Sequence, residues 1–471
     1  MIFTSFEFIA FFAALLLLRG LMKSFAAEKW LLLIASWLFY MSWNPPFVLL
    51  LMFTSGLDYF VGHWLEGTQR PAARRLLLTA SLVANLGILA YFKYTNFFLE
   101  TWHGLLASVG ITFHPVVLNI VLPAGISFFT LLSMSYTIDV YRRDIPACKS
   151  LRDFLLFVAF FPQLVAGPIV RAADFLPQVL QRRRAAWKDV ESGLALFALG
   201  AIKKLAISDQ IAGHVELVFT NPGTYDALSL LLAAIGFGVQ IYCDFSGYSD
   251  MAIGCARMMG YDFCINFKMP YSSANITEFW RRWHISLSTW LRDYLYISLG
   301  GNRRSARRTQ INLLLTMLLG GLWHGASWNF VIWGGLHGIA LIAHKVWCGF
   351  RGKKPGAMPS RIGTAAGWAL TMGVVFVGWI FFRASGLTAA TTMLARIFTW
   401  DTGGVRMLSP QILVAIAVVA ATHLIVPKDS NWPHWIVERP MAWRIAAYTG
   451  FLMTLLCFGA RESAPFIYFQ F

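Results

Sequence analysis

The chain has 471 residues, of which 57% are hydrophobic and 13% are charged, and its mean hydropathy is +0.59. Soluble globular domains carry about 25% charged residues, so this composition excludes a soluble globule and predicts an integral membrane protein. The formal net charge of +16 raises the question of nucleic acid binding. The lysines and arginines, however, collect in short loops between apolar runs, which is the positive-inside pattern of a multi-pass membrane protein.

Apolar runs recur along the whole chain and predict one all-α membrane domain over residues 1–471, with its core at about 115–345. A membrane-spanning helix needs about 20 apolar residues, and on this basis we expect roughly eleven or twelve transmembrane or re-entrant segments. The first lies at residues 2–18 and lacks a basic n-region and a small-residue cleavage site, which predicts a retained span instead of a signal peptide. Others are expected at residues 31–42, 47–65 and 76–92.

The chain then becomes less regular. Residues 93–114 are mixed in polarity and predict an outer loop or an interfacial helix. Pro123 and Gly125 interrupt the next apolar run. Backbone groups freed by such a break cannot face lipid, so we expect this segment to face protein or a cavity.

Two carboxylates follow the apolar run at residues 228–242, in the sequence DFSGYSD of residues 244–250. Asp244 and Asp250 lie beside hydroxyl groups, a pattern that fits an acid–base pair. It also fits a buried carboxylate that pairs with an arginine or with hydroxyls and holds a cavity wall in place, and we favour this second interpretation. Asp244, Ser246 and Tyr248 are therefore candidates for the wall of a cavity.

Residues 275–294 have the pattern of an amphipathic helix in a membrane interface. Asn275 is a suitable N-cap, and Glu278 three residues later completes a capping box. At helical spacing one arc is apolar, while His284 falls just beyond its edge beside Ser288. The apolar arc contains Phe279, Trp280, Trp283, Leu287, Trp290, Leu291 and Tyr294. The opposite side carries Arg281, Arg282, Arg292 and Asp293.

His324 ends an almost uncharged stretch that begins at Ile311. Glycines flank it at positions 320, 321 and 325, which permits close backbone approach or a break in the helix. An ionisable group at membrane depth is costly to bury, so His324 is a functional candidate by default. His337 and His344 follow, seven residues apart; we expect both to be hydrogen-bonded packing residues that share a helix face. Later spans are expected near residues 364–382, 411–426 and 443–460.

The six cysteines are scattered, without a Cys-x-x-Cys pair, so the sequence indicates neither a disulfide framework nor a thiolate metal site. We interpret the cysteines as small buried hydrophobic residues. Phosphate-binding glycine loops, zincin motifs and nucleophile elbows are also absent from the sequence, and no metal is expected.

Several motifs resemble those of the membrane-bound O-acyltransferase (MBOAT) family and occur in its order. They are QIYCDFSGYSDMAIG at 240–254, NFKMPY at 266–271, TEFWRRWHISLSTWLRDY at 277–294, GGNR at 300–303 and WHG at 323–325. Within the family the likeness is to the bacterial branch that O-acetylates alginate and cellulose, and more distantly to the D-alanyl transfer protein of teichoic acid modification. The resemblance implies a ring of helices around a central funnel or tunnel, with interfacial helices on the cytoplasmic side.

The chemistry implied by the resemblance defines the roles of the site residues. Acylating a sugar hydroxyl requires a group that removes its proton and a group that stabilises the oxyanion. A histidine at membrane depth is biased toward its neutral form and so accepts a proton at ordinary pH. The family's motif-bearing histidine falls on His324, which we assign as general base, while His284 would position or polarise the donor carbonyl. Ser327 and Asn329 are weaker candidates for oxyanion donors.

Further supporting or tunnel-lining candidates are Asp244, Ser246, Tyr248, Glu278, Trp323, Ser327, Asn329 and His337. The expected donor is acetyl-CoA or an acylated carrier protein, which acts as a substrate and not as a bound cofactor. An anionic donor would dock against positive charge on the cytoplasmic face. The docking candidates are Arg281, Arg282, Arg292, Arg303 and Arg304.

The resemblance also implies a bacterial inner-membrane location with a periplasmic N-terminus, and a separate periplasmic acetyltransferase as partner. A transporter or flippase would show similar broken helices and intramembrane polar groups, although it predicts internal repeats that we do not see. A metal-dependent membrane oxidase would use His284, His324, His337 and His344, but their spacing matches no common ligand motif. The sequence leaves open which polysaccharide is acetylated.

Overall fold

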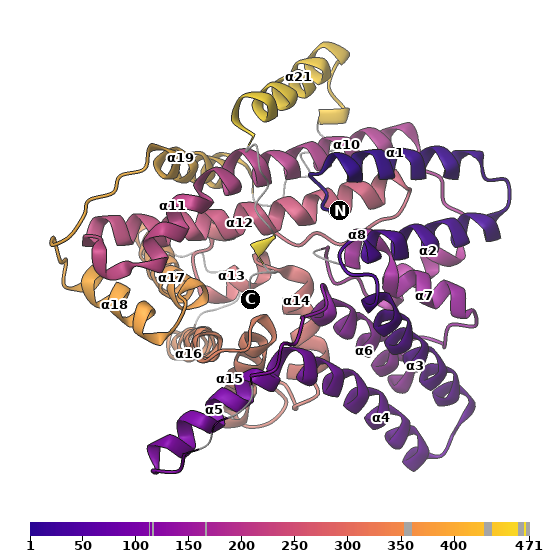
Figure 1. Ribbon diagram of the computed structural model, residues 1–471, viewed down its shortest axis with the longest axis horizontal. Helices are drawn as coiled ribbons and strands as arrows, with labels where there is room; N and C mark the ends of the chain where they lie inside the picture. The colour runs from indigo at the N-terminus through magenta and orange to yellow at the C-terminus, as the bar shows by residue number, and fades with distance from the viewer. Residues whose placement is uncertain are drawn as a thin grey trace. The chain divides into compact units, whose positions relative to one another are not determined.

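The computed structural model of the protein describes residues 1–112, 114, 117–164, 167–352, 360–427, 436–459 and 466–467. Within these ranges the regular structure is helical, apart from an isolated bridge between Tyr225 and Val405 (Figure 1). Residue contacts divide the chain into two compact units. The first comprises Met1–Leu194 and Ala252–Cys264, and the second comprises Ala195–Met251 and Ile265–Phe471.

The first unit contains the N-terminal helices. These are α1 (Phe6–Leu21), α2 (Phe25–Met41), α3 (Phe47–Gly67), α4 (Pro71–Leu89), η1 (Ala90–Tyr94), α5 (Thr95–Ser108), α6 (Ile126–Arg142), α7 (Leu151–Ala159), α8 (Phe161–Leu164), α9 (Ala172–Leu180) and the first part of α10 (Trp187–Ala201). The four predicted N-terminal segments correspond to α1 to α4. The segment predicted as a broken helix is instead the start of α6: residues 117–125 are not helical, and Gly125 adopts a left-handed conformation with φ +71° immediately before the helix.

Helices α3, α4 and α6 lie side by side in the first unit (Figure 1). A fully buried carboxylate joins them: Asp58 on α3 accepts hydrogen bonds from Ser81 and Asn85 on α4 and from Thr137 on α6, the last at 3.1 Å. Buried polar groups require such partners, so this cluster fixes how the three helices pack.

The second unit contains the rest of the helices. These are η2 (Ile202–Ser208), α11 (Asp209–Thr220), η3 (Pro222–Thr224), most of α12 (Ala227–Met258), η4 (Pro270–Ser272), α13 (Ile276–Arg282), α14 (Ile285–Trp290), η5 (Leu291–Tyr296), α15 (Ala306–His324), α16 (Trp328–Phe350), α17 (Arg361–Arg383), α18 (Leu387–Phe398), α19 (Pro410–Ile425) and α21 (Met441–Phe458). The predicted C-terminal spans correspond to α17, α19 and α21.

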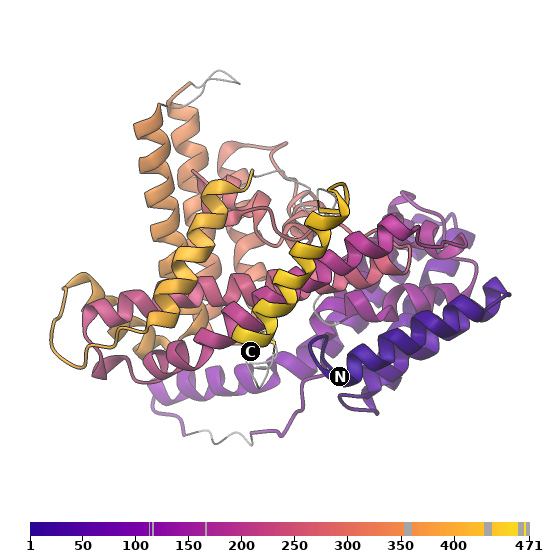
Figure 2. The same cartoon turned by 90° about the horizontal axis from the view of Figure 1, so that it is seen from above.

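Close packing of α15 and α16 positions His324 at the end of α15. A side chain at Gly321 would collide with the carbonyl oxygen of Phe330, and one at Gly334 would collide with that of Met317. Glycines at such contacts let two helix backbones approach closely. Helix α17 packs against α16 and runs beside it (Figure 2).

Six helical runs in the described part of the chain are long and apolar enough to cross a membrane. They are Phe47–Gly67, Pro71–Ser108, Ala227–Met258, Trp328–Phe350, Arg361–Arg383 and Met441–Phe458. Residues 95–108 of the segment predicted as an outer loop or an interfacial helix form α5, which continues the helical run of α4 through η1. Other expected segments are shorter: α1 has 16 residues and α2 has 17. The all-α, multi-pass membrane class is confirmed.

Candidate active site

The predicted amphipathic helix over residues 275–294 is broken at His284. Helix α13 ends at Arg282, α14 begins at Ile285, and the backbone of His284 between them is left-handed, with φ 43°. The expectation of one continuous helix was therefore wrong. The predicted apolar face is nevertheless correct, because all seven of its side chains are no more than 8% exposed.

Asn266 explains the break and holds the His284 ring. Its backbone carbonyl accepts the N–H of Ile285 at 2.9 Å, and its side-chain Oδ1 lies 3.1 Å from Nδ1 of His284. The same oxygen accepts the N–H of Ser286 at 3.3 Å and its hydroxyl at 2.9 Å, while Nδ2 donates to the hydroxyl of Ser249 at 3.1 Å. The sequence identifies Asn266 only as part of a motif, and its contact with His284 was not predicted.

These contacts define the protonation state of His284. A backbone N–H can only donate, so the atom of Asn266 that faces Ser286 is an oxygen, and Nδ1 of His284 must donate to it. Nε2 is then left with a lone pair. Complete burial lowers the pKa of His284 to about 3, so the ring is neutral at ordinary pH.

His324 lies next to His284 in an aromatic shell. The centroids of the two imidazole rings are 6.4 Å apart. The His324 ring is 4.9 Å from that of Trp323, 5.0 Å from Trp333 and 5.4 Å from Phe382, and the residue is 4% exposed. The structure thus brings together the two histidines that the sequence singled out, with Trp323 beside them.

His337 and His344 on α16 both face α13. The indole N–H of Trp280 donates to Nδ1 of His337 at 3.3 Å, and Nδ1 of His344 lies 2.9 Å from the hydroxyl of Thr277. The prediction that these histidines are hydrogen-bonded and share a helix face is confirmed. Among the described residues, no three His, Cys, Asp or Glu side chains are placed to share a metal ion.

Asp244 is held by a lysine that the sequence analysis missed. Lys204 on η2 lies 2.7 Å from Asp244 and 2.8 Å from Asp209, and all three side chains are buried. Asp244 also accepts the N–H of Ile467 at 2.8 Å, so its partners are neither the arginine nor the hydroxyl that we expected. Tyr248 covers the lysine, with its ring 5.6 Å from Nζ, and Ser246 is buried nearby on α12. Asp250 pairs separately with Lys203 at 2.6 Å.

The proposed oxyanion donors lie at the start of α16. Ser327 is its N-cap and makes no side-chain capping bond, whereas the side-chain amide of Asn329 donates to the carbonyl of Ala384 at 2.9 Å. One N–H of Asn329 is therefore committed to holding α16 against the chain after α17.

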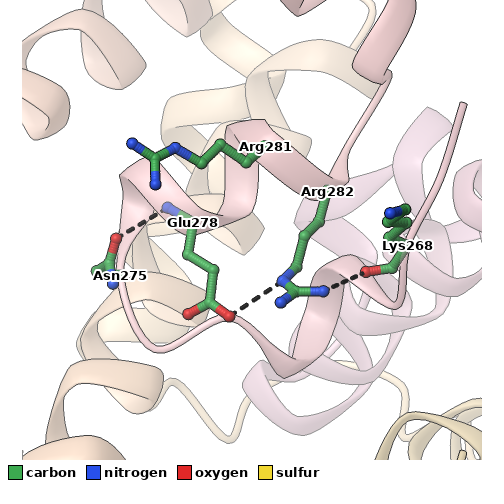
Figure 3. A pocket seen from close by; sticks show the side chains of 5 residues that line it. All are labelled: Lys268, Asn275, Glu278, Arg281 and Arg282. Atoms are coloured by element: carbon green, nitrogen blue, oxygen red, sulfur yellow. Dashed lines mark hydrogen bonds and ion pairs between the residues drawn. The ribbon is translucent and has the colours of Figure 1, made fainter. Parts of the chain in front are cut away.

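A polar pocket of about 480 Å³ opens beside α13 (Figure 3). Its lining residues are Lys268, Asn275, Glu278, Arg281 and Arg282. Half of the predicted capping box is present, because Asn275 accepts the N–H of Glu278 at 2.8 Å. The Glu278 carboxylate accepts the N–H of Ala274, one residue before the N-cap, at 3.0 Å. Arg282 is fixed by Glu278 at 3.0 Å and by the carbonyl of Lys268 at 3.3 Å, whereas Arg281 points away from this pair (Figure 3).

A second, mainly apolar pocket of about 590 Å³ lies between the α13–η5 segment and helices α15 and α16. Arg281 lines both pockets, and Arg292 lines only the second. Arg303 and Arg304 line neither, and the same is true of His284 and His324. Two of the residues that line the apolar pocket adjoin histidines: Trp280 bonds to His337, and Ile285 follows His284 in the chain.

The helical spans define a multi-pass membrane protein, and its second unit holds two neighbouring buried histidines, His284 and His324. Residues 74–387 match the membrane-bound O-acyltransferase family, and the chain belongs to this family. It is therefore an O-acyltransferase, as the motifs predicted.

Curated relatives are similar to the chain over different shares of its length. It is 40% identical to the probable alginate O-acetylase AlgI of Azotobacter vinelandii, with 100% of both chains covered. It is 36% identical to the peptidoglycan O-acetyltransferase of Helicobacter pylori, over 81% of this chain and 76% of the relative. A more distant relative, at 30% identity over 47% of this chain and 57% of its own length, is the teichoic acid D-alanyltransferase of Streptococcus thermophilus.

Proposed function

We propose that the protein moves an acetyl group from a cytoplasmic thioester donor across the bacterial inner membrane for the O-acetylation of an exported polysaccharide such as alginate. The full-length similarity to an alginate O-acetylase supports acetyl as the group and an exported polymer as its destination. The observation that carries the mechanism is the buried pair His284 and His324, with 6.4 Å between ring centroids.

His324 acts in this proposal as the general base. It removes the proton of the acceptor hydroxyl as the oxygen attacks the thioester carbonyl, and it returns the proton to the departing thiolate. Its aromatic shell excludes water, which strengthens every electrostatic interaction in the site. The oxyanion would be stabilised by hydrogen-bond donors near the start of α16, where Ser327 lies.

His284 has a different part from the one that we first expected. Because Nδ1 donates to Asn266, the neutral ring has no N–H left with which to polarise a carbonyl. Its Nε2 is a buried acceptor, suited to receive a hydrogen bond from the acceptor hydroxyl and to orient it toward the donor. His284 thus positions the nucleophile while His324 takes the proton.

The donor is acetyl-CoA or an acylated carrier protein, and both carry phosphate. The polar pocket offers Lys268, Arg281 and Arg282 to an anion, with one carboxylate, Glu278, already engaged by Arg282. Arg281 also lines the apolar pocket. A donor whose phosphate binds in the polar pocket can therefore extend its uncharged arm into the apolar pocket, toward Trp280. This arrangement suits a phosphopantetheine thioester.

The proposed function also requires an orientation in the membrane and a partner protein that receives the acetyl group. We place the arginine-rich segments on the cytoplasmic side and the N-terminus in the periplasm, because basic loops are retained inside. A separate periplasmic acetyltransferase would then accept the acetyl group and transfer it to polymer.

The direct test is the rate of CoA release from acetyl-CoA by purified protein in liposomes. Replacing His324 by Ala should lower this rate by about 10²–10⁴-fold, the range expected for loss of a general base. His423→Ala is the matched control, since His423 is also buried and its ring, among the described residues, hydrogen-bonds to the carbonyl of Val419 on its own helix. A His324→Ala protein that folds and still releases CoA at the normal rate would refute the proposal, as would substrate flux without CoA release.

A further inference from the structure

Two ring nitrogens on α16 are buried and have no hydrogen-bond partner among the described residues. They are Nε1 of Trp333, which is 1% exposed, and Nε2 of His337, which is 0% exposed. Residues four apart on a helix lie on one face, so both nitrogens belong to the same surface of α16. Buried polar atoms nearly always have a partner in folded proteins. The pair therefore indicates a bound atom that the described residues do not supply.

The contact of His337 with α13 makes its free nitrogen a donor. The indole N–H of Trp280 can only donate, and it lies 3.3 Å from Nδ1 of His337. Nδ1 therefore carries a lone pair, and the neutral ring carries its proton on Nε2. The two unpaired nitrogens, Nε1 of Trp333 and Nε2 of His337, are thus both N–H donors, and their ligand is a hydrogen-bond acceptor.

Both donors face Gly378 on α17. A Cβ added to this glycine would lie 3.0 Å from Nε2 of His337 and 3.5 Å from Nε1 of Trp333. A side chain at position 378 would therefore press against the two donors, and glycine leaves the space beside them open. One small acceptor, such as a single oxygen atom, can receive both N–H groups there.

Trp333 connects this position to the general base. Its ring centroid lies 5.0 Å from that of His324 and 4.8 Å from that of His337. An acyl group held at Trp333 is therefore beside the imidazole to which we assign proton transfer. Trp333 lies in the second turn of α16, and its N–H is free, whereas the amide of Asn329 donates to the carbonyl of Ala384.

We propose that Trp333 and His337 form the oxyanion hole of the acyl transfer, with both N–H groups donating to the carbonyl oxygen of the acyl group. This inference rests on the proposed function, because it uses the same thioester and the same base. As the acceptor oxygen attacks the carbonyl carbon, the electron pair of the C=O double bond moves onto the oxygen between the two donors. The double bond then re-forms, the carbon–sulfur bond breaks, and His324 passes the proton of the acceptor hydroxyl to the thiolate. Donors fixed where negative charge develops stabilise the transition state more than the bound substrate.

The first test removes each donor and measures CoA release from acetyl-CoA by full-length protein in liposomes, with a water-soluble hydroxyl acceptor. Trp333→Phe keeps an aromatic ring and deletes the N–H, so kcat should fall by about 10²–10³-fold with little change in KM. His337→Leu should have the same effect. His337→Gln should recover most of the lost rate, because its side-chain amide supplies an N–H near the position of Nε2.

The second test fills the space and leaves both donors in place. Gly378→Ala should lower kcat at least about tenfold, because the methyl group occupies the position beside the donors. Gly373→Ala is the matched control, since Gly373 is also on α17 and an added Cβ there meets nothing within 4 Å. Its kcat should equal that of the native protein. Thermal unfolding in detergent verifies that each variant folds.

A spectroscopic measurement distinguishes a catalytic role from a structural one. Infrared spectra of acetyl-CoA labelled with carbon-13 at the carbonyl, bound to His324→Ala, should show a carbonyl band that moves to higher frequency when Trp333→Phe is added. An unmoved band together with a native kcat in Trp333→Phe and His337→Leu would overturn the oxyanion hole and leave the proposed function standing. Loss of stability without loss of kcat would also overturn it, because the donors would then hold only a structural water. Absence of any CoA release from the native protein would instead refute the proposed function.

Discussion

A single residue, His284, combines an unusual backbone conformation with a strongly lowered pKa. A left-handed conformation is uncommon for a residue other than glycine, and here Asn266 maintains it by bonding to the backbone on the C-terminal side of the break and to the ring. The ring is fully buried against Phe245, with ring centroids 4.6 Å apart. The neutral state of His284 is therefore a consequence of packing and not of a neighbouring charge.

Acid should destabilise the folded protein through this residue. Burial lowers the pKa of His284 from its ordinary value of 6.5 to about 3, so between these values the unfolded chain binds a proton that the folded chain does not. Above about pH 6.5 this residue does not lower the free energy of unfolding. As the pH falls from 6.5 toward 3, the free energy of unfolding decreases by up to about 1.4 kcal/mol for each pH unit. We expect the difference in thermal stability between native protein and His284→Asn to shrink on acidification from pH 7 to pH 4.

Asparagine is the suitable replacement, because it tolerates a left-handed backbone and does not titrate. If the thermal stabilities of the native protein and of His284→Asn differ by the same amount at every pH in this range, the assignment of a low pKa to His284 is contradicted.

Sequence periodicity identified which side chains near His284 are buried but not how the chain runs between them. Phe279 and Leu287 fall on one arc of an ideal helix, and both are buried on either side of the break. The break depends on Asn266, which lies 18 residues upstream and acts through tertiary contacts. A local pattern carries no information about such a contact, and the same limit applies to Lys204, whose charge gave no sign that it would be buried between Asp209 and Asp244.

At the scale of elements, the hairpin of α15 and α16 depends on glycines at its contact surface. A side chain at Gly334 would meet the backbone of Met317 and Leu318, whereas one at neighbouring Gly335 would meet only the end of the Leu318 side chain, at 3.6 Å. Gly334→Ala should lower the free energy of unfolding by about 1–3 kcal/mol, because overpacking forces the helices apart. Gly335→Ala should be neutral or stabilising by up to about 1 kcal/mol, because alanine favours helix.

Thermal unfolding in detergent measures both variants. Equal stability of Gly334→Ala and Gly335→Ala would show that the two helices do not pack as described.

Helix α13 presents two consecutive arginines with different tasks. Arg282 is bonded to Glu278 and to the Lys268 carbonyl, so Arg282→Ala should destabilise the fold around the break.

Arg281 lines both pockets and points away from that pair, so Arg281→Ala should raise the KM for acetyl-CoA about tenfold with little change in kcat. Steady-state kinetics at low and high salt would check this, since the effect should diminish as salt screens the charge. An unchanged KM in Arg281→Ala would remove the polar pocket from the donor site.

For the whole molecule, composition and hydropathy were sufficient for the membrane class, and the motifs were sufficient for the family. The number and lengths of the spans were less predictable. Apolar content does not distinguish a span from a buried helix: α12 is 32 residues long and largely buried, and α5 prolongs α4 into a 38-residue run. Among the candidate site residues, those that share a sequence motif, such as Trp323 and His324, could be identified from the sequence as neighbours. Those joined only by tertiary contacts, such as Asp244 and Lys204, required the structure.

The proposed mechanism requires acetyl to cross the membrane by chemistry at His324 while the rest of the donor stays behind. Labelled acetyl-CoA sealed inside proteoliposomes, with a water-soluble hydroxyl acceptor outside, tests it most directly. We predict labelled acetyl ester on the outer acceptor and unlabelled CoA retained in the lumen, with neither product formed by His324→Ala. Passage of intact acetyl-CoA to the outside, or normal ester formation by His324→Ala, would contradict the account.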